Sequence, residues 1–366
     1  MTDCLGTSNG GSPTEDSELI LTAFLLGLTA LYADDSTVRV GVFVLFRPAE
    51  LVLSPIPAGL IELETDEGNI VMEGAQSARL RFSGSQVECR AGGRVIHSRA
   101  LRTKPRAGAV SEFTLGGPGK IERRFRGVLE VAAGTGSLIP VVKMQRETAV
   151  ASALAAESPP GASMEALKAQ AVAMRSYYAA ERGRHQGYDF CDSTHCQFLR
   201  EPPQPDSVFS HATEATRGLV LAYRGATIPG FFAASCGGRT HSLEQVGMRA
   251  EGYPYYSVEC AYCRRNAREW ETRLPAAEGT APLQEGPSEK LRLRITRELG
   301  WSAIPGNHFS VTPDGDMFVV RGRGAGHGVG LCQQGAAGMA LSGAGFLDIL
   351  RHYFPNTQLA AVPSGP

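Results

Sequence analysis

The chain has 366 residues, with 36 Lys and Arg against 37 Asp and Glu, and therefore a formal net charge of -1. Hydrophobic residues make up 43% and charged residues 20%, a globular composition that excludes a wholly disordered chain and a long coiled coil. The near-zero net charge argues against nucleic acid as the main partner. The length suits one large domain or two of average size.

The first 36 residues contain an apolar run that is typical of a signal segment. The run covers residues 19–33, which is short for a membrane span but suits the hydrophobic part of a signal peptide. Glu15, Asp16 and Glu18 precede the run, where a signal peptide carries basic residues. The run predicts a targeting segment over 1–36 and an exported protein of the periplasm or cell envelope. A buried helix and a wrongly assigned start are the alternatives.

Short strands are expected after this segment. Residues 37–46 alternate and then become continuously apolar, as in a buried strand. Residues 50–125 contain short apolar runs punctuated by Gly, Pro and Asn, which favours a β-rich part over 37–120. Residues 128–131 and 138–142 indicate a hairpin around Gly134 and Gly136.

Two helices follow the strands. Residues 147–157 are rich in Ala, and a Ser-Pro-Pro-Gly break follows. Ser163 is a good N-cap for a second helix from Met164 to about Arg182. Residues 275–290 read as a polar surface excursion, and residues 317–321 read as a strand that leads through a Gly-rich turn to a helix near 335–341. The mixed pattern predicts an α+β fold.

The Gly-rich stretch over 322–330 invites a nucleotide-loop interpretation. It lacks the Gly-Lys-Ser/Thr ending of a P-loop, and no GxGxxG frame fits it. Its small residues would let a polymer lie against the backbone, with His327 embedded among them. A tight structural loop with a surface His is the alternative.

Five of the eight cysteines fall between residues 191 and 263. Cys191 and Cys196 enclose His195, and two residues separate Cys260 from Cys263. Four thiolates in two close pairs match a structural zinc site in number. Two disulfides, an open site built from Cys191, His195 and Cys196, and free core thiols are the alternatives.

Two further residues have both a functional and a structural interpretation. Cys236 is either a nucleophile or a small buried hydrophobe, and the second is the more usual role of Cys. Glu157 ends an Ala-rich helix, where the helix dipole disfavours an acidic residue. It is either a general acid projecting into a cleft or a solvated helix end.

Five segments occur in an order that resembles one family. They are EALKAQAVAMRSY over 165–177, YDFCDSTHCQ over 188–197, ATRGL over 215–219, SCGG over 235–238 and GRGAGHGVGLCQQGA over 322–336. The sequence resembles the stage II sporulation protein D/LytB (SpoIID-like) family over roughly residues 120–358, and residues 38–46 are similar to its N-terminal part. The resemblance implies a SpoIID-like catalytic domain over 121–358 and a tail over 359–366.

The resemblance implies a role in peptidoglycan metabolism. The best-understood members of the family are lytic transglycosylases that cut glycan strands lacking stem peptides. The resemblance places their catalytic Glu on Glu157, and it places basic residues of the groove on Lys168 and Arg175. Four more substrate-binding residues are expected near the groove with them: Ser235, Thr240, His327 and Gln333.

The expected chemistry needs one carboxyl. Hydrolytic glycosidases usually use two, whereas a lytic transglycosylase uses the C6 hydroxyl of its own substrate. Glu157 would protonate the oxygen between MurNAc and GlcNAc, then accept the proton of the C6 hydroxyl, leaving a 1,6-anhydro end. The resemblance assigns a catalytic role to no second Asp or Glu. Nearby Lys168 and Arg175 would oppose the raised pKa that a general acid needs.

The implied partners are peptidoglycan glycan strands and a cell-wall amidase. The chemistry requires no cofactor, although the segment with Cys191, His195 and Cys196 matches one that binds zinc in some members. Two other functions stay open. One is a non-catalytic peptidoglycan-binding protein that enhances an amidase. The other is a zinc-dependent hydrolase, which lacks an HExxH arrangement in this sequence.

Overall fold

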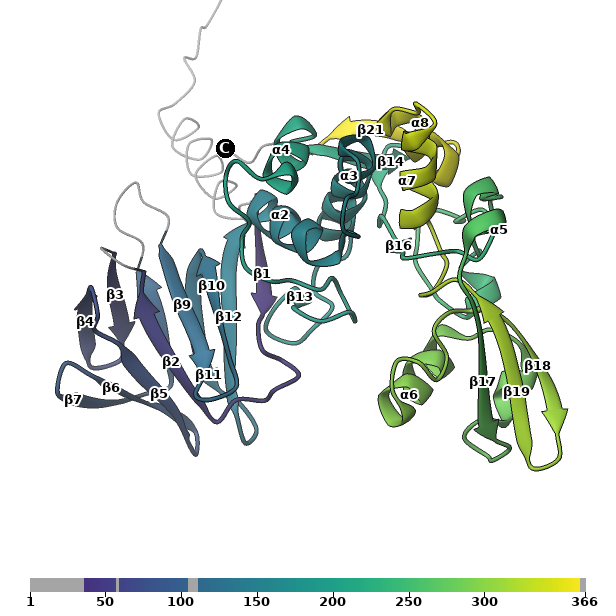
Figure 1. Cartoon of the computed structure of the whole chain (residues 1–366). Helices are drawn as coiled ribbons and strands as arrows, with labels where there is room; N and C mark the ends of the chain where they lie inside the picture. Colours follow the sequence, from purple (N-terminus) through teal and green to yellow (C-terminus); the bar gives the residue numbers. More distant parts are fainter. Residues whose placement is uncertain (1–35, 57–58, 105–110, 363–366) are drawn as a thin grey trace, which may run out of the picture. The chain divides into compact units, whose positions relative to one another are not determined.

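The computed structural model describes residues 36–56, 59–104 and 111–362 (Figure 1). The apolar run over 19–33, on which the export prediction rests, lies outside the described residues, as does Cys4. Among the helices of the described part, none combines the length and the apolar character that crossing a membrane requires. The mixture of helices with several sheets confirms the predicted α+β fold.

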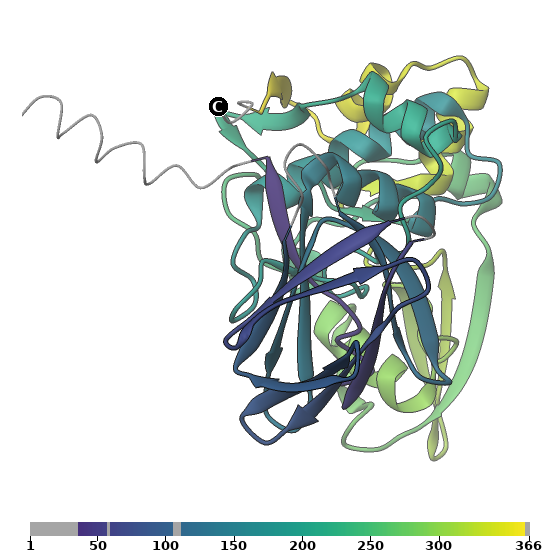
Figure 2. The ribbon, with the colours of Figure 1, turned by 90° about the vertical axis from the view of Figure 1, so that its left-hand side faces the viewer.

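The β-rich part is built from two largely antiparallel sheets whose strands cross in Figure 2. The first has the strand order β13-β1-β12-β11-β8-β3-β4 and the second β10-β9-β2-β5-β6-β7. The strands are β1 (Thr37–Gly41), β2 (Glu50–Pro55), β3 (Leu60–Thr65), β4 (Gly68–Glu73), β5 (Ala78–Ser83), β6 (Gln86–Ala91), β7 (Arg94–Ser98), β8 (Ala100–Lys104), β9 (Glu112–Gly117), β10 (Ile121–Arg126), β11 (Val128–Ala133), β12 (Leu138–Gln145) and β13 (Phe190–Cys191).

Alternating burial explains how these strands build a core. In β2, Leu51 and Leu53 are fully buried while their neighbours are partly exposed, because successive side chains of a strand point to opposite faces. The buried side chains of both sheets join those of the first two helices in one apolar cluster. The β-rich part and these helices therefore share a core.

The strand expected over 37–46 ends at Gly41, so its predicted length is wrong. β1 pairs with β12 on one side and with β13 on the other. The chain then turns, with Phe43 at φ 58°. Phe43 remains buried after the strand has ended, and its N–H donates to the carboxylate of Asp192 at 2.8 Å. Val42 and Phe43 are thus buried in an irregular turn, whereas Leu45 and Phe46 at the end of the apolar run are exposed.

The predicted hairpin and helix pair are confirmed. β11 and β12 pair antiparallel from Val128 opposite Lys143 to Ala133 opposite Leu138. α2 (Arg146–Glu157) follows β12 directly, and α3 (Met164–Ala180) begins after the predicted break. The Ser163 hydroxyl accepts the N–H of Ala166 at 3.4 Å and so caps α3. Both helices lie at one end of the sheets in Figures 1 and 2.

A second apolar cluster lies beyond α3. It contains side chains of β14 (Leu219–Tyr223), β20 (Leu331–Cys332), α5 (Ala261–Asn266), α7 (Gln333–Leu341) and α8 (Phe346–Tyr353). β14 pairs with β15 (Ala226–Thr227) and β21 (Gln358–Ala361), and β16 (Phe232–Ala233) pairs parallel with β20. α4 (Val208–Ala215) precedes β14, and the short helix η1 covers Glu244–Val246. The helix predicted near 335–341 corresponds to α7.

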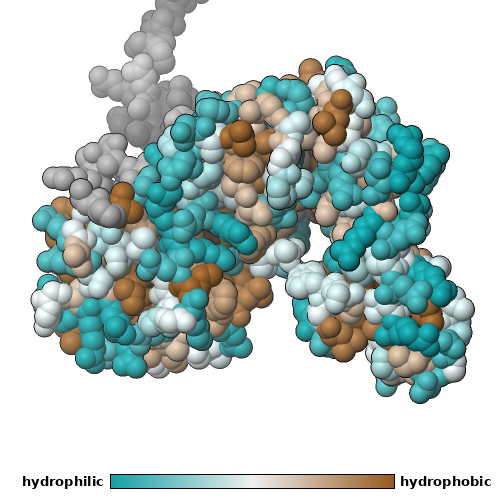
Figure 3. Space-filling model, in the orientation of Figure 1, coloured by the Kyte–Doolittle hydropathy of each residue, from teal (hydrophilic) through white to brown (hydrophobic). Residues whose placement is uncertain are grey.

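A third, smaller cluster belongs to a three-stranded sheet. The sheet contains β17 (Glu269–Pro275), β18 (His308–Asp314) and β19 (Met317–Arg323), and α6 (Glu289–Leu299) and the short helix η2 (Ala281–Glu285) lie between β17 and β18 in the chain. Leu283 of η2 is buried, so the expected surface excursion over 275–290 contributes to a core. On the face drawn in Figure 3, apolar residues form small separate patches among hydrophilic ones.

Candidate functional site

A cleft with a volume of about 450 Å³ opens at the end of α2. Its walls come from α2, α3, the 194–197 loop, the 230–234 segment, α6 and the Gly-rich loop. The lining residues are Glu157, Tyr177, Thr194, Cys196, Gln197, Gly230, Phe231, Phe232, Ala233, Ala234, Glu289, Arg292, Leu293, Trp301, Pro305, Ala325, Gly326, His327 and Gln333. The cleft therefore brings together Glu157, His327 and Gln333 from the predicted site.

The Glu157 carboxyl sits in a setting that favours its protonated form. Burial raises its pKa from an ordinary 4.5 to about 7, and one hydrogen bond opposes this rise. In that bond the N–H of Phe198 donates to Oε1 at 2.5 Å. Neither of these two causes involves a basic side chain. Glu157 is thus a carboxyl that can release and accept a proton near neutral pH.

Gln333 connects the Gly-rich loop to the C-terminal end of α2. Its side-chain amide donates to the backbone carbonyl of Glu157 at 2.8 Å. The Gly-rich loop can approach the neighbouring backbone closely because glycine occupies the point of contact. Gly330 has φ 72°, and a Cβ there would lie 2.2 Å from the carbonyl oxygen of Phe231. The Gly-rich stretch is therefore a close-approach loop, as one interpretation of the sequence held.

His327 is held in that loop as a neutral ring. Its Nδ1 accepts the N–H of Val329 at 3.0 Å, so the proton of the neutral ring must be on Nε2. Burial lowers the pKa of His327, which keeps the ring uncharged at neutral pH. His327 lines the cleft without bringing a positive charge to it.

The structure does not bring Arg175 to the cleft. Its guanidinium is fully buried and makes two hydrogen bonds to the Glu147 carboxylate, at 2.7 and 2.8 Å. It also donates to the backbone carbonyls of Thr213 and Leu219, each at 3.1 Å. The arginine joins α2, α3 and α4, and a glycan in the cleft has no access to it. The expectation that Arg175 lines the groove is therefore wrong.

Lys168, Ser235 and Thr240 also lie outside the cleft lining. The Lys168 ammonium pairs with Glu165 at 2.7 Å on the same helix. The hydroxyl of Ser235 is buried 3.5 Å from the Cys263 sulfur, and the hydroxyl of Thr240 accepts the N–H of Val258 at 2.8 Å. Ala234, the neighbour of Ser235, lines the cleft, but these three side chains make contacts within the surrounding structure.

Glu289, Arg292 and Trp301 are among the cleft residues that the sequence analysis missed. Glu289 and Arg292 form a nearly buried ion pair at the start of α6, and Trp301 follows that helix with 60% of its surface exposed. Residues 275–290 looked like a surface excursion because Pro, Gly and charged residues dominate them. The apolar positions Leu291 and Ile295, four apart on one helix face, were the available signal.

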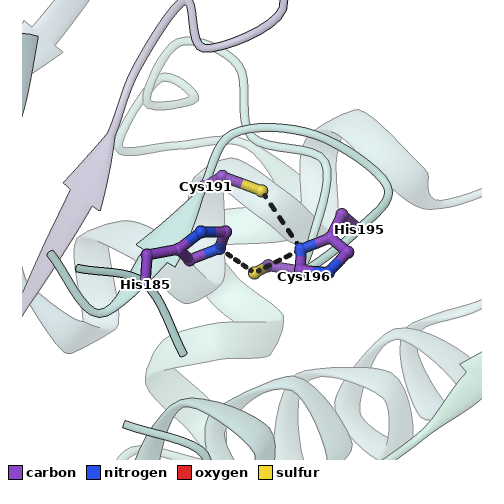
Figure 4. Close-up of side chains that lie close together, drawn as sticks. All are labelled: His185, Cys191, His195 and Cys196. Atoms are coloured by element: carbon purple, nitrogen blue, oxygen red, sulfur yellow. Dashed lines mark hydrogen bonds between the residues drawn. The ribbon is translucent and has the colours of Figure 1, made fainter. Parts of the chain in front are cut away.

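A His/Cys cluster lies beside the cleft and consists of His185, Cys191, His195 and Cys196. Figure 4 shows the two imidazoles and the two sulfurs converging on one point. The Cys196 sulfur is 3.2 Å from Nε2 of His185 and 3.7 Å from Nδ1 of His195, and Cys191 is 3.8 Å from the same Nδ1. A tetrahedral zinc ion would separate such ligands by roughly 3.5 Å, so this set fits zinc. The sequence had missed His185.

Cys260 and Cys263 do not join this cluster, and the five predicted metal residues therefore do not form one site. These two cysteines converge instead with Cys236 and Cys332. All four are unbridged, as are Cys191 and Cys196. The disulfide alternative for these residues is not what the structure shows.

Comparisons with known proteins show which protein family this chain is similar to. The family model "Stage II sporulation protein" (SpoIID) matches residues 135–223. An uncharacterized protein of Brachyspira hyodysenteriae is 29% identical over 278 residues, which are 68% of this chain and 74% of that protein. Stage II sporulation protein D of Bacillus amyloliquefaciens is 25% identical over 262 residues, which are 60% of this chain and 75% of that protein. These matches support a SpoIID-like family for the chain.

A shorter similarity points to a second named relative. The amidase enhancer of Bacillus subtilis is 32% identical over 75 residues, which are 20% of this chain and 10% of that protein. The SpoIID-matched segment contains α2, α3, Glu157 and the whole His/Cys cluster. The opposite wall of the cleft, with α6 and the Gly-rich loop, lies outside that segment. The SpoIID-like match thus covers only part of the candidate site.

Proposed function

We propose that this chain acts on the bacterial cell wall as a peptidoglycan lytic transglycosylase, with Glu157 as its acid and base. The observation that carries the proposal is the Glu157 carboxyl, whose pKa burial raises to about 7 in an open cleft. The names of the sporulation and amidase-enhancer relatives support the cell-wall context. Mass spectrometry of the cleavage products tests the proposal.

Glu157 would act twice in one reaction. Its protonated carboxyl donates a proton to the oxygen between MurNAc and GlcNAc as that bond breaks. The resulting carboxylate then accepts the proton of the C6 hydroxyl while that oxygen attacks the anomeric carbon. The products are a 1,6-anhydro end and a free hydroxyl, and Glu157 ends protonated. A pKa near 7 suits both directions of transfer.

The second carboxylate of the cleft is not placed to act as a nucleophile. Both oxygens of Glu289 accept hydrogen bonds from Arg292 at 2.7 Å, and one also accepts the amide of Asn307 at 2.8 Å. A retaining glycosidase needs a second carboxylate free to attack the sugar. The engaged state of Glu289 therefore supports the one-carboxyl scheme over a two-carboxyl hydrolase.

The acid role sets an expected pH dependence. Because the pKa of Glu157 is raised, the donor form persists up to about pH 7 and is lost as the pH rises further. We expect kcat/KM to fall by about tenfold per pH unit above that point. Initial rates on denuded glycan measured across neutral pH check this. A flat profile through pH 7, or a rate that rises there, would contradict the acid role.

Trp301 is expected to bind the glycan by stacking against a sugar ring. Its exposed indole lines the cleft, and the apolar face of a sugar would bury against it. We expect Trp301→Ala to raise KM by about tenfold, on the order of 1.4 kcal/mol, with little change in kcat. Leu341→Ala removes an apolar group that is 80% exposed outside the cleft lining and serves as the control. Equal KM values for the two variants would refute the stacking role.

We propose further that the His/Cys cluster holds a structural zinc ion. The ion would fix the loop that supplies Thr194, Cys196 and Gln197 to the cleft wall. We expect Cys191→Ser/Cys196→Ser to lose one zinc per chain and to increase protease cleavage between residues 184 and 197. Elemental analysis and peptide mapping measure the two effects. Unchanged zinc content in this variant would contradict the assignment.

A further inference from the structure

Four further cysteines converge in the interior of the protein. None of them belongs to the His/Cys cluster. Cys236, Cys260, Cys263 and Cys332 form this four-cysteine cluster, and all four are buried. Their sulfur atoms all lie within 4.8 Å of one another, and the Cys263 and Cys332 sulfurs are 3.4 Å apart. Neither the catalytic scheme nor the His/Cys cluster uses any of them.

The cluster collects its sulfurs from three separate segments. Cys236 follows β16, Cys260 and Cys263 lie at the start of α5, and Cys332 ends β20. Packing alone would not need four sulfurs at one point, because Cys serves as a small hydrophobe wherever space allows. Four sulfur atoms brought together from three segments are the arrangement that binding of one shared metal ion requires.

The surroundings of the cluster supply donors to the sulfurs. The backbone N–H groups of Cys236 and Gly335 both donate to the Cys332 sulfur at 3.3 Å. The Tyr353 hydroxyl lies 3.4 Å from the Cys260 sulfur, and the Ser235 hydroxyl lies 3.5 Å from the Cys263 sulfur. Such donors stabilise negative charge on sulfur, and thiolates bound to metals are hydrogen-bonded in this way.

We propose that the four-cysteine cluster binds one tetrahedral zinc ion. Zinc–sulfur bonds of about 2.3 Å separate four thiolates by about 3.8 Å, a spacing that agrees with the observed convergence. Four-thiolate tetrahedral sites suit zinc or iron–sulfur centres. An iron–sulfur cluster carries its thiolates on different iron atoms and holds the sulfurs farther apart, so the compact spacing favours a single ion.

The site lies directly behind the cleft wall. Cys332 precedes Gln333, whose side-chain amide donates a hydrogen bond to the backbone carbonyl of Glu157. Cys332 is also opposite Ala233 in the β16–β20 pair, and Ala233 lines the cleft. The ion would thus fix the Gly-rich loop and the 230–234 segment to α5. This positioning role rests on the proposed function, whereas the metal site itself does not.

Zinc content of the 366-residue chain tests the site. We expect two zinc ions per chain in the parent protein and one in Cys260→Ser/Cys263→Ser. Cys89→Ser is the matched control, because Cys89 is equally buried but lies in β6, outside both clusters. It should retain two ions, as should Glu157→Gln. Metal content is measured without substrate, so failure of the glycan assay leaves this result unaffected.

X-ray absorption at the zinc edge keeps the test valid if the double variant fails to fold. With both sites filled, the parent chain should show an average of three sulfur ligands per zinc, because one site has four sulfurs and the other has two. One zinc with two sulfur and two nitrogen ligands would overturn the proposal. So would iron with acid-labile sulfide, or a disulfide within the four-cysteine cluster.

Discussion

Glu157→Gln is expected to reduce glycan cleavage by at least about 100-fold, since positioned acid–base groups contribute about 10²–10⁴ to rates. The amide has nearly the shape of the carboxyl, and its oxygen can still accept the N–H of Phe198. It can neither donate the proton that the leaving oxygen needs nor accept one from the C6 hydroxyl. Initial rates of anhydro-end formation on denuded strands measure the loss.

The folding stability of Glu157→Gln, measured across pH, is the control for its loss of activity. The pKa of Glu157 is higher in the folded chain than its ordinary 4.5, so its contribution to stability is full below about pH 4.5 and is lost as the pH rises through about 7. The amide of the variant does not ionise. We therefore expect Glu157→Gln to be folded and to gain stability relative to the parent as the pH approaches about 8. An active variant, or an inactive one that has unfolded, would remove the support for acid–base catalysis.

Arg175→Met is expected to lower the free energy of unfolding by about 3–5 kcal/mol, the usual cost of breaking a buried ion pair. The change leaves the Glu147 carboxylate without its bidentate partner, and it leaves the carbonyls of Thr213 and Leu219 without theirs. Chemical denaturation at neutral pH measures the loss.

Lys168→Met provides the comparison with Arg175→Met. Its ion pair with Glu165 on the same helix is partly exposed, and solvent-accessible pairs contribute about 0–1 kcal/mol. The double change Glu147→Gln/Arg175→Met should recover part of the lost stability, because it removes both charges. If Arg175→Met kept full stability and raised KM for glycan, the arginine would be a groove residue after all.

Local pattern was sufficient to predict the elements that carry Glu157. Ser163 before an apolar helical period indicates where α3 begins, and the Pro-Pro break indicates where α2 ends. These signals are local in the chain, and the structure confirms both helices. The same pattern could not show burial of the Glu157 side chain, which depends on the 194–198 loop and the Gly-rich loop.

The sequence alone could not show which residues that are far apart in the chain contact one another. The family resemblance placed Arg175 in the groove, but Glu147 reaches it from α2. The cysteines were grouped by spacing, whereas the structure groups them by convergence, with His185 completing one set. Trp301 and α6 enter the cleft only through tertiary packing, which no periodicity encodes.

A non-catalytic peptidoglycan-binding protein is the alternative that the sequence left open. Such a protein would bind glycan without cutting it. Sedimentation with purified sacculi separates the two functions. A binding protein would sediment equally as the parent and as Glu157→Gln, with no soluble fragments from either.

The most direct measurement is mass spectrometry of the material that the chain releases from amidase-treated sacculi. The proposed mechanism predicts fragments that end in 1,6-anhydro-MurNAc with the parent protein, and none above background with Glu157→Gln. Fragments with reducing ends would indicate hydrolysis by water and contradict the mechanism. Full release of anhydro fragments by Glu157→Gln would contradict the assignment of the acid and base to Glu157.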